Sequence, residues 1–445
     1  MRYNICTMNK YYYIHTYGCQ MNVHESEKIA GMLEDEGYLP TDDESESDIL
    51  IFNTCCIRDN AEKKIMGHIG DAKHLKKLKP SLIIGVVGCM TQQEGVADSL
   101  KQKFPHVNIV LGTSNLSDLG QAVREVNSGL VKSYKEIIED STVEINEEIP
   151  VRRSSGTNAW VNIMYGCNNF CTYCIVPHVR GRERSRDFDV ILDEIKMLLS
   201  EGYKEITLLG QNVDSYNYEN RRFVDILKAV SEIDGKFRLR FMTSHPKDFN
   251  SEVIDVIKNS RNICNNIHLP VQSGSNNVLK AMNRRYTREQ YLDIIAEIKD
   301  KMPNCGITSD IMVGFPGETD KDFEDTLDLV QRVRFSNAFT FVYSPRKGTP
   351  AAAMTQLPYD VKKNRITTLV NLQNEITKSL SNEYIAKIEE VLVEDINPKK
   401  DGFVCGRTES GRLVNFAGSS DLIGQFLKVK INSARSAALW GEING

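Results

Sequence analysis

The sequence contains no long apolar run. No segment approaches the ~20 consecutive apolar residues that a membrane-spanning helix needs, and residues 1–10 have no apolar core of the kind found in signal peptides. We therefore expect a cytoplasmic protein without membrane contact, in which cysteines stay reduced.

A strong net charge is also missing. Lys and Arg number 55 against 60 Asp and Glu, which gives a formal net charge of −5 and an isoelectric point near 6.0. This composition excludes binding of nucleic acid through an overall positive field, so any contact with RNA must come from local patches. Apolar residues make up 41% of the chain, which is enough for the cores of several domains.

Three of the 11 cysteines form one short loop in which a fourth cysteine is missing. Cys167, Cys171 and Cys174 have the spacing C-x3-C-x2-C and follow an apolar run at residues 160–164. Closed structural zinc sites and ferredoxin clusters have four protein ligands, whereas three thiolates on a four-iron cluster leave one iron open. The alternatives are three free cysteines in a core and a zinc site whose fourth ligand lies far away in the sequence.

The first part of the chain, residues 11–126, predicts an open parallel α/β sheet. Strands are expected at residues 12–18, 48–54, 81–88 and 107–111, and helices at residues 22–36 and 59–79. The first three strands are followed by Cys19, Cys55 and Cys89. Ligands bind beyond the carboxyl ends of such strands, and adjacent strands lie ~4.8 Å apart, so these cysteines can converge on a second cluster.

Two other interpretations of these cysteines remain open. Cys56 competes with Cys55 as a ligand, because successive strand residues point to opposite faces. Buried cysteines can also pack simply as small hydrophobic residues.

The middle of the chain, residues 158–380, predicts a partial (β/α)6 barrel with its site at the carboxyl ends of the strands. It follows a charge-rich linker at residues 127–157, with one short strand expected at 143–149. Barrel strands are expected at residues 160–164, 205–211, 237–243, 266–271, 306–314 and 338–343, with helices between them. The cysteine loop follows the first of these strands and therefore lies at the active face.

The end of the chain, residues 381–445, predicts a small all-β barrel after a long helix at residues 361–387. Short β segments with glycine turns are expected at residues 391–394, 403–407, 413–416 and 426–431. Such barrels often bind RNA, but the charges nearly balance here, and a purely structural cap is an equal alternative.

The loop Cys167–Cys174 resembles the radical S-adenosylmethionine (SAM) motif, with Tyr173 at the aromatic position. Several further motifs are similar to those of the methylthiotransferase family, and the C-terminal segment resembles its TRAM domain. These motifs are Tyr17–Asn22, Asn53–Cys55, Gly88–Met90, Arg180–Arg186, Leu269–Ser275 and Gly314–Thr319. Residues around Cys19, together with Thr243–Pro246, are most similar to the members that modify isopentenylated adenosine in tRNA.

This resemblance implies two [4Fe-4S] clusters and SAM as cofactors. Cys167, Cys171 and Cys174 would hold the cluster that cleaves SAM to a radical. Cys19, Cys55 and Cys89 would hold an auxiliary cluster that carries added sulfur, which a second SAM methylates. The radical would remove hydrogen from carbon 2 of N(6)-isopentenyladenosine at position 37, and the methylthio group would then be added there.

The resemblance also leaves two alternative functions. The same chemistry could act on threonylcarbamoyladenosine in tRNA or on a ribosomal-protein side chain, and a protein of another class would be a non-catalytic iron–sulfur scaffold. The expected partners are the tRNA anticodon loop with isopentenyladenosine, a reduced electron-transfer protein and a sulfur donor. We expect the protein to be a monomer.

Other polar residues are candidates for binding SAM, and none beyond the clusters is assigned a catalytic role. These candidates are Tyr173, Arg184, Gln211, Asn212, Ser273 and Asp310. The four arginines at 180, 182, 184 and 186 can pair with RNA phosphates or with the SAM carboxylate, unless they form only a solvated turn. Glu318 is a candidate for SAM or adenine, or for structural hydrogen bonds. The remaining cysteines have no partner spacing and are expected not to be ligands: Cys6, Cys264, Cys305 and Cys405.

Overall fold

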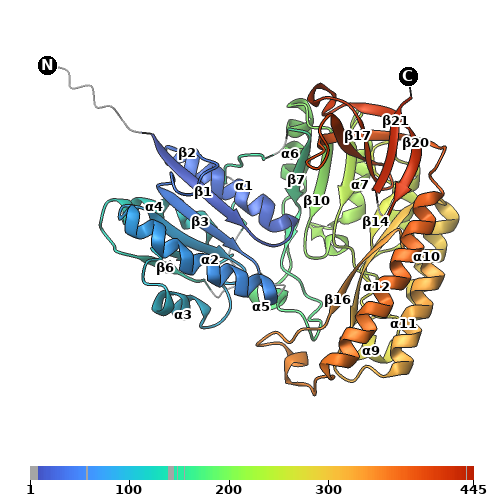
Figure 1. The fold of residues 1–445 in the computed structure, drawn as a ribbon, viewed down its shortest axis with the longest axis horizontal. Helices are drawn as coiled ribbons and strands as arrows, with labels where there is room; N and C mark the ends of the chain where they lie inside the picture. The colour runs from blue at the N-terminus through green and yellow to red at the C-terminus, as the bar shows by residue number, and fades with distance from the viewer. Residues whose placement is uncertain are drawn as a thin grey trace. The chain divides into compact units, whose positions relative to one another are not determined.

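The computed structural model describes residues 9–56, 59–138, 145–147, 149–154, 156–436 and 438–444. The chain forms two compact units (Figure 1). The first unit comprises Met1–Ser154, Gly166–Asn168 and Ile175–Glu183. The second unit comprises Ser155–Tyr165, Asn169–Cys174 and Arg184–Gly445.

The first unit contains a six-stranded parallel sheet with the order β2-β1-β3-β4-β5-β6. Its strands are β1 (Lys10–Thr16), β2 (Tyr38–Pro40), β3 (Ile49–Thr54), β4 (Ile83–Gly88), β5 (Ile109–Leu111) and β6 (Tyr134–Glu136). Its helices are α1 (Gln20–Asp35), α2 (Asp59–Leu78), α3 (Val96–Lys103), α4 (Leu119–Asn127) and α5 (Val176–Val179).

Each strand of this sheet sends alternate side chains to opposite faces. Both faces are buried, because helices pack on each of them. Ile49 and Ile51 of β3 pack in a core with α1 and α4. Leu50 and Phe52 of the same strand pack in a second core with α2 and α3. Burial on both faces thus explains why the strand segments in the sequence are largely apolar and do not alternate between apolar and polar residues.

The predicted parallel sheet is confirmed, and β1, β3 and β4 are direct neighbours. The strands β2 and β6 were not predicted, and β6 lies within the segment that we assigned to a linker. The strand expected at residues 143–149 falls partly outside the described residues, and its described residues 145–147 and 149 form no strand.

The second unit contains six parallel strands in two three-stranded arcs, as predicted for a partial barrel. One arc has the order β13-β10-β7 and the other β14-β15-β16. The strands are β7 (Asn158–Asn162), β10 (Glu205–Leu209), β13 (Arg238–Phe241), β14 (Asn266–His268), β15 (Gly306–Val313) and β16 (Asn337–Val342). Two short pairs, β8 (Met164–Tyr165) with β9 (Arg184–Ser185) and β11 (Asn217–Tyr218) with β12 (Arg221–Arg222), lie in the connections.

The helices of this unit follow the predicted pattern except for the short α9, which was not predicted, and one apolar core joins helices and strands. They are α6 (Phe188–Ser200), α7 (Phe223–Ser231), α8 (Ser251–Asn259), α9 (Asn276–Ala281), α10 (Arg288–Lys301), α11 (Asp320–Val333) and α12 (Tyr359–Asn382). The long helix α12 packs on β15, β16 and α11, as Figure 1 shows.

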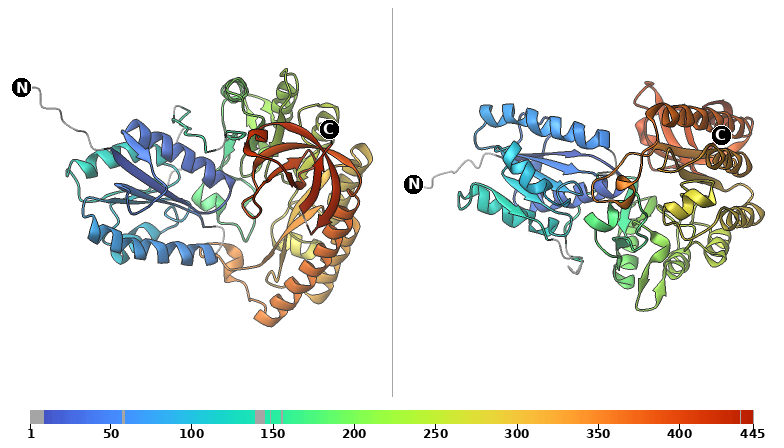
Figure 2. Two further views of the ribbon diagram at one scale, coloured as in Figure 1. Left: turned by 45° about the horizontal axis from the view of Figure 1, so that its top comes forward. Right: turned by 90° about the horizontal axis from the view of Figure 1, so that it is seen from below.

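The chain ends in a closed five-stranded barrel with the order β17-β18-β19-β21-β20, drawn in red in the left view of Figure 2. Its strands are β17 (Ile388–Ile396), β18 (Phe403–Thr408), β19 (Leu413–Ala417), β20 (Phe426–Arg435) and β21 (Ala438–Ile443), of which β21 was not predicted. Two buried arginines of β13 hold this barrel in the second unit. Arg238 donates to the carbonyls of Arg407 and Glu390, and Arg240 donates to those of Thr408 and Glu409.

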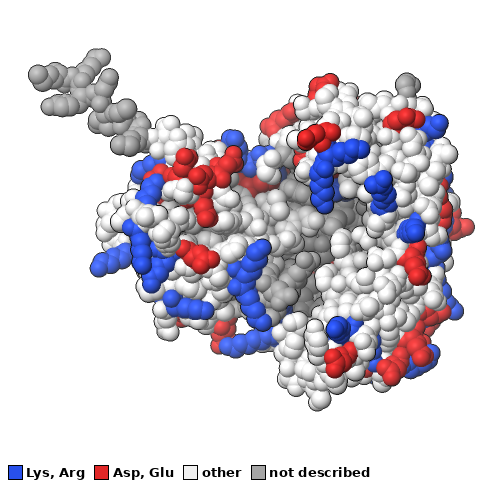
Figure 3. All heavy atoms as spheres, in the orientation of Figure 1, with Lys and Arg blue, Asp and Glu red and all other residues white. Residues whose placement is uncertain are grey.

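None of the helices in the described part of the chain is both long and apolar enough to cross a membrane. Figure 3 shows basic and acidic side chains interspersed over the face in view, as expected from the nearly balanced charge of the chain.

Candidate functional site

Three cysteines stand at the carboxyl ends of neighbouring strands in the first unit. Cys55 and Cys89 directly follow β3 and β4, and Cys19 caps the start of α1 just after β1. Hydrogen bonds tie these strand ends together: the Cys89 backbone N–H and the Asn22 Nδ2 both donate to the Thr54 carbonyl, at 3.1 and 2.9 Å. The Cys19 thiol donates to Asn22 Oδ1 at 3.7 Å. The structure therefore places the predicted cysteines at neighbouring strand ends, where Cys55 and Cys89 are buried and Cys19 is partly exposed.

Two glycines allow the backbone to approach these cysteines closely. Gly18 has φ +118°, and a Cβ added there would lie 2.7 Å from Cys55 Cβ and 2.9 Å from Cys55 Sγ. Gly88 has φ +101°, and its added Cβ would lie 2.6 Å from the Thr54 carbonyl oxygen. Each position thus needs glycine for both its backbone angle and its space. A side chain at either glycine would therefore collide with Cys55 or with the backbone of β3.

Cys56 is also part of this cluster of thiols. Cys56 is buried, and its side chain is hydrogen-bonded to Cys89. This bond is the largest cause of the shifts in both pKa values, and it raises the pKa of Cys56 and lowers that of Cys89. Four thiols therefore lie at these strand ends, and Cys55 contacts Gly18 whereas Cys56 contacts Cys89.

The chemistry of these side chains bears on the kind of metal site that they could form. Within the described ranges, no three His, Cys, Asp or Glu side chains are grouped closely enough to hold a single metal ion. A zinc ion requires ligand sulfurs at ~2.3 Å from one centre, whereas a four-iron cluster spreads its ligands over several metal atoms. A donor set made only of thiols suits an iron–sulfur cluster.

A buried arginine lies beside these thiols. Arg180, which belongs to the first unit, forms a bidentate ion pair with Glu25 of α1, at 2.6 and 3.1 Å. It also donates to Asn22 Oδ1 at 3.4 Å and to Cys89. The sequence alone suggested that Arg180 could bind phosphate or the SAM carboxylate, but its guanidinium is buried against Glu25 instead.

Residues 169–174, which carry Cys171 and Cys174 of the second cysteine set, are anchored by a segment more than a hundred residues further along the chain. In the second unit, the Asn283 side chain donates to the carbonyls of Asn169 and Phe170, at 3.3 and 3.0 Å. The backbone N–H of Thr172 donates to Met282 at 3.1 Å. The loop from residue 169 to 174 therefore has a fixed backbone conformation, which includes Phe170 at φ +47°.

A second buried arginine lies beside this loop, and sequence analysis missed it. Arg284 Nη1 lies 3.7 Å from Cys171 Sγ, while its other nitrogens donate to the Pro270 carbonyl and to Tyr286. A guanidinium next to a thiol favours the thiolate, which is the form that binds metal. Each of the two cysteine sets thus has its own buried cation.

Several polar atoms near the ends of the barrel strands are buried and lack a hydrogen-bond partner within the described ranges, among them Asn212 Oδ1 and His245 Nε2. The Asn212 amide donates to Asp248 at 2.7 Å, so its oxygen remains as an acceptor. His245 Nδ1 accepts from the Lys247 backbone, so Nε2 carries the proton and is a donor. Burial, with Arg284 and Lys247 nearby, lowers the pKa of His245 to about 2 and keeps it neutral.

The other predicted SAM-binding residues have varied surroundings. Ser273 is buried and its hydroxyl accepts from the Ser275 backbone at 3.2 Å. Asp310 is partly exposed on β15, 3.8 Å from His268. Tyr173 packs against the apolar cluster around Phe315, and its burial raises its pKa. Arg184 lies in β9, where burial lowers its pKa, and Gln211 follows β10.

Two of the three other predicted candidates form ion pairs within the protein. Arg186 pairs with Glu194 at 2.8 Å and donates to the Asn162 carbonyl. Glu318 accepts from the Gly314 backbone and pairs with Arg365 at 2.7 Å. Both are therefore engaged within the second unit, whereas Arg182 is exposed.

Cys264, Cys305 and Cys405, the remaining cysteines that the structure describes, have surroundings of their own. Burial raises the pKa of Cys264 and Cys305 to about 12, so both are protonated thiols. Cys405 donates to the carbonyl of Ile396 in the C-terminal barrel. Cys6 lies outside the described residues.

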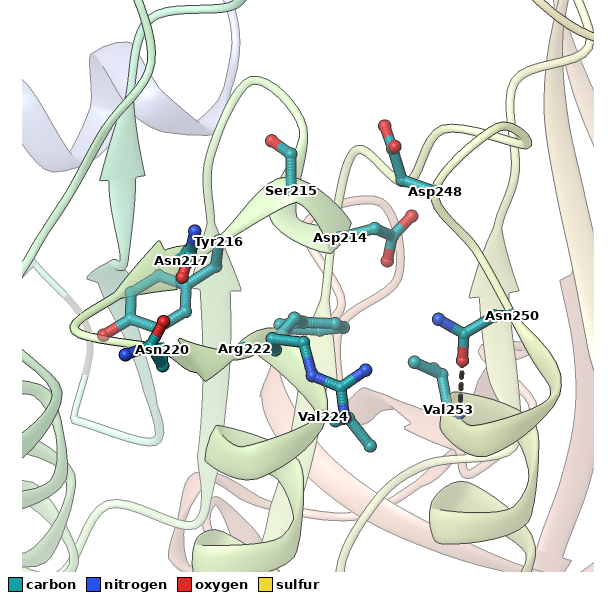
Figure 4. A pocket seen from close by; sticks show the side chains of 11 residues that line it. Asp214, Ser215, Tyr216, Asn217, Asn220, Arg222, Val224, Asp248, Asn250 and Val253 are labelled. Carbon is teal, nitrogen blue, oxygen red and sulfur yellow. Dashed lines mark hydrogen bonds between the residues drawn. The ribbon is translucent and has the colours of Figure 1, made fainter.

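A cavity of about 370 Å³ lies beside the segment that follows β10 (Figure 4). Asp214, Arg222, Asp248 and Asn250 are among its lining residues, but none of the predicted SAM-binding residues is. Asp214 accepts from the His245 backbone at 2.9 Å and from Ser244 at 3.3 Å. Burial, reinforced by Asp248, raises the pKa of Asp214 to about 8.

Comparisons with protein families agree with this organisation. Residues 161–330 match the Radical SAM superfamily, residues 382–443 match the TRAM domain, and residues 11–112 match a family described as the uncharacterized protein family UPF0004. The chain is similar in fold to the radical SAM methyltransferase TsrM from Kitasatospora setae, with a TM-score of 0.57 at 12% identity over 78% of this chain and 77% of that one.

Two close relatives cover nearly the whole chain. The tRNA-2-methylthio-N(6)-dimethylallyladenosine synthase of Clostridium botulinum (strain Langeland) is 52% identical over 97% of this chain and 96% of that protein. The enzyme of the same name from Desulforamulus reducens is 49% identical over 99% of this chain and 97% of that protein. This chain therefore belongs to the tRNA-2-methylthio-N(6)-dimethylallyladenosine synthase family of the radical SAM superfamily.

Proposed function

We propose that this protein is a tRNA methylthiotransferase that converts N(6)-isopentenyladenosine at position 37 into its 2-methylthio derivative. The observation that carries this proposal is the presence of two separate three-cysteine sets in one chain of this family. One set stands at the ends of three neighbouring strands and the other forms the loop C-x3-C-x2-C. A single electron-carrying cluster would need only one set with four ligands.

Each set fits one [4Fe-4S] cluster. Cys167, Cys171 and Cys174 would hold the first, and Cys19, Cys55 and Cys89 the second, with one iron of each left open. When bound, the first supplies reductive cleavage of SAM, and the second supplies the sulfur that is methylated and transferred. Four of the six thiols are buried, and the positive charge of the two arginines beside them complements the negative charge of such clusters.

The chain itself supplies binding groups around these sites. Asn212 Oδ1 offers an acceptor and neutral His245 Nε2–H offers a donor, both buried and directed at no described protein group. These two atoms suit polar groups of SAM. Tyr173, Arg184, Gln211, Ser273 and Asp310 remain candidates for the same cofactor.

The C-terminal barrel offers a surface for tRNA. Lys400 Nζ lies 3.5 Å from the Phe403 ring centroid and 5.1 Å from that of Trp440, and Arg435 lies 5.9 Å from the Trp440 ring. Aromatic rings combined with cations suit stacking on bases and pairing with phosphates. This local patch supplies the positive charge that the chain lacks as a whole.

Nucleoside analysis of tRNA from cells that lack the gene tests the proposed substrate. We expect 2-methylthio-N(6)-isopentenyladenosine to disappear and N(6)-isopentenyladenosine to accumulate. An unchanged level of the methylthio nucleoside would contradict the proposal. In that case threonylcarbamoyladenosine in tRNA or a ribosomal-protein side chain would become the substrate to examine.

The partners and location follow from this reaction. A reduced electron-transfer protein must deliver electrons, and a sulfur donor must restore the transferred sulfur. We expect the protein to be a monomer in the cytoplasm, where it would encounter the electron-transfer protein, the sulfur donor and the tRNA. The scaffold alternative predicts no SAM cleavage, whereas anaerobic protein with dithionite and SAM should yield 5′-deoxyadenosine above a Cys174→Ala control.

A further inference from the structure

Arg180 and Glu25 form a buried ion pair in the first unit. Arg180 is 7% exposed and Glu25 is 6% exposed. Both guanidinium nitrogens Nη1 and Nη2 donate to the carboxylate, at 2.6 and 3.1 Å. Two charges taken out of water in this way influence nearby groups strongly, because solvent screens them little.

The ion pair touches the thiols at the strand ends. Asn22 Oδ1 accepts from both Arg180 Nη2, at 3.4 Å, and the Cys19 thiol, at 3.7 Å. Arg180 also donates directly to Cys89 and interacts electrostatically with Cys19. The guanidinium therefore faces two of the three thiols assigned to the auxiliary cluster.

The segment that carries Arg180 is held firmly in this position. Ile175 and Val179 pack with Cys56 and Cys89 in one apolar cluster. The Thr113 hydroxyl donates to the Val179 carbonyl. Of the arginines in the run from 180 to 186, Arg180 is the one that these contacts place among the thiols, whereas Arg182 is exposed.

The charges of this pair act in opposite directions on a cluster. A four-iron cluster with three thiolate ligands is negatively charged, and reduction adds a further negative charge. A nearby cation stabilises the reduced form and raises the reduction potential, whereas a nearby anion lowers it. Outer hydrogen bonds to ligating sulfurs have the same tuning effect.

We propose that Arg180 and Glu25 are positioning residues that set the reduction potential of the auxiliary cluster, with Arg180 raising it and Glu25 lowering it. This inference rests on the proposed function, because it needs a cluster at Cys19, Cys55 and Cys89. The competing interpretation is an ion pair that only holds the 175–183 segment against α1.

The experiment uses the full chain with Cys167→Ala, Cys171→Ala and Cys174→Ala, so that only the auxiliary cluster is loaded. Four further variants are compared with this parent: Arg180→Gln, Glu25→Gln, the double variant, and Arg182→Gln as a control. Arg182→Gln removes the same charge from the exposed part of the same segment. The reduction potential is measured by anaerobic redox titration with an electron paramagnetic resonance readout.

We expect Arg180→Gln to lower the reduction equilibrium constant about tenfold, which is ~59 mV for one electron. Glu25→Gln should shift the potential by a similar amount in the opposite direction. The double variant and Arg182→Gln should both stay near the parent value. A purely structural ion pair does not predict opposite signs for its two halves.

The outcomes separate this inference from the proposed function. A parent protein that binds no cluster contradicts the assignment of the second cysteine set. A loaded cluster whose potential is the same in Glu25→Gln and in the parent overturns the roles of Arg180 and Glu25 alone. If Arg180→Gln does not retain its cluster, the other two variants still test the proposed roles. Glu25→Gln should raise the reduction potential, and the double variant should return it to the parent value.

Discussion

Gly18→Ala is the substitution that most sharply probes the strand-end thiol site. The added Cβ would lie 2.7 Å from Cys55 Cβ and 2.9 Å from Cys55 Sγ, so Cys55 or the backbone of residue 18 must move. Gly18 also has φ +118°, which alanine rarely adopts. We therefore expect both the fold of this segment and the binding of a cluster to suffer.

The expected loss in the free energy of unfolding of Gly18→Ala has two parts, which a control variant can separate. Placing alanine at positive φ costs roughly 1–2 kcal/mol. Overpacking against Cys55 adds about 1–3 kcal/mol. Gly37, at the end of α1, has φ +83° but no atom within 4 Å of an added Cβ, so Gly37→Ala carries only the first part.

The assay combines stability with metal content. Urea unfolding should show a greater loss for Gly18→Ala than for Gly37→Ala, by about 1–3 kcal/mol. Iron and sulfide in the reconstituted protein should fall toward half in Gly18→Ala and stay at the wild-type level in Gly37→Ala. Equal stability and equal iron in the two variants would refute the close contact between Gly18 and Cys55.

Three further predictions concern other residues. Cys55→Ala should lose the auxiliary cluster, as judged by iron content, whereas Cys56→Ala should retain it; the reverse result would make Cys56 the ligand. Arg365→Met leaves the buried Glu318 without its cation and should cost about 3–5 kcal/mol in urea unfolding, and adding Glu318→Gln should recover part of this loss. The pKa of Asp214 is about 8 in the folded protein, above its value of about 3.9 in the unfolded chain. The contribution of Asp214 to the free energy of unfolding is therefore full below about pH 3.9 and is lost as the pH rises through 8. The melting temperature of Asp214→Asn relative to wild type should therefore rise between pH 5 and 8 and level off above, and a parallel pH dependence in both proteins would contradict this.

The strand-end cysteines could be predicted from the sequence because their signals are local. Strand β4 and the first four residues of β3 are apolar apart from glycine, a cysteine directly follows each strand, and burial on both faces favours such runs. The barrel strands and their helices show similarly strong local patterns. Short strands such as β2 and β6 contain only three residues each, which is too few for a pattern.

The surroundings of the thiols could not be predicted, because they depend on contacts distant in sequence. Nothing in the run of alternating arginines distinguishes Arg180, which is buried against Glu25, from exposed Arg182. The approach of Arg284 to Cys171 likewise joins residues 113 positions apart. These pairings arise from packing of whole elements, whereas the motif itself is carried by one loop.

The central claim is that the chain holds two clusters, one on each cysteine set. Iron and sulfide per chain, measured in anaerobically reconstituted wild-type protein, test it most directly. We expect about eight of each in the wild type and about four of each after Cys167→Ala, Cys171→Ala and Cys174→Ala. About four in the wild type and none in the triple variant would contradict the claim.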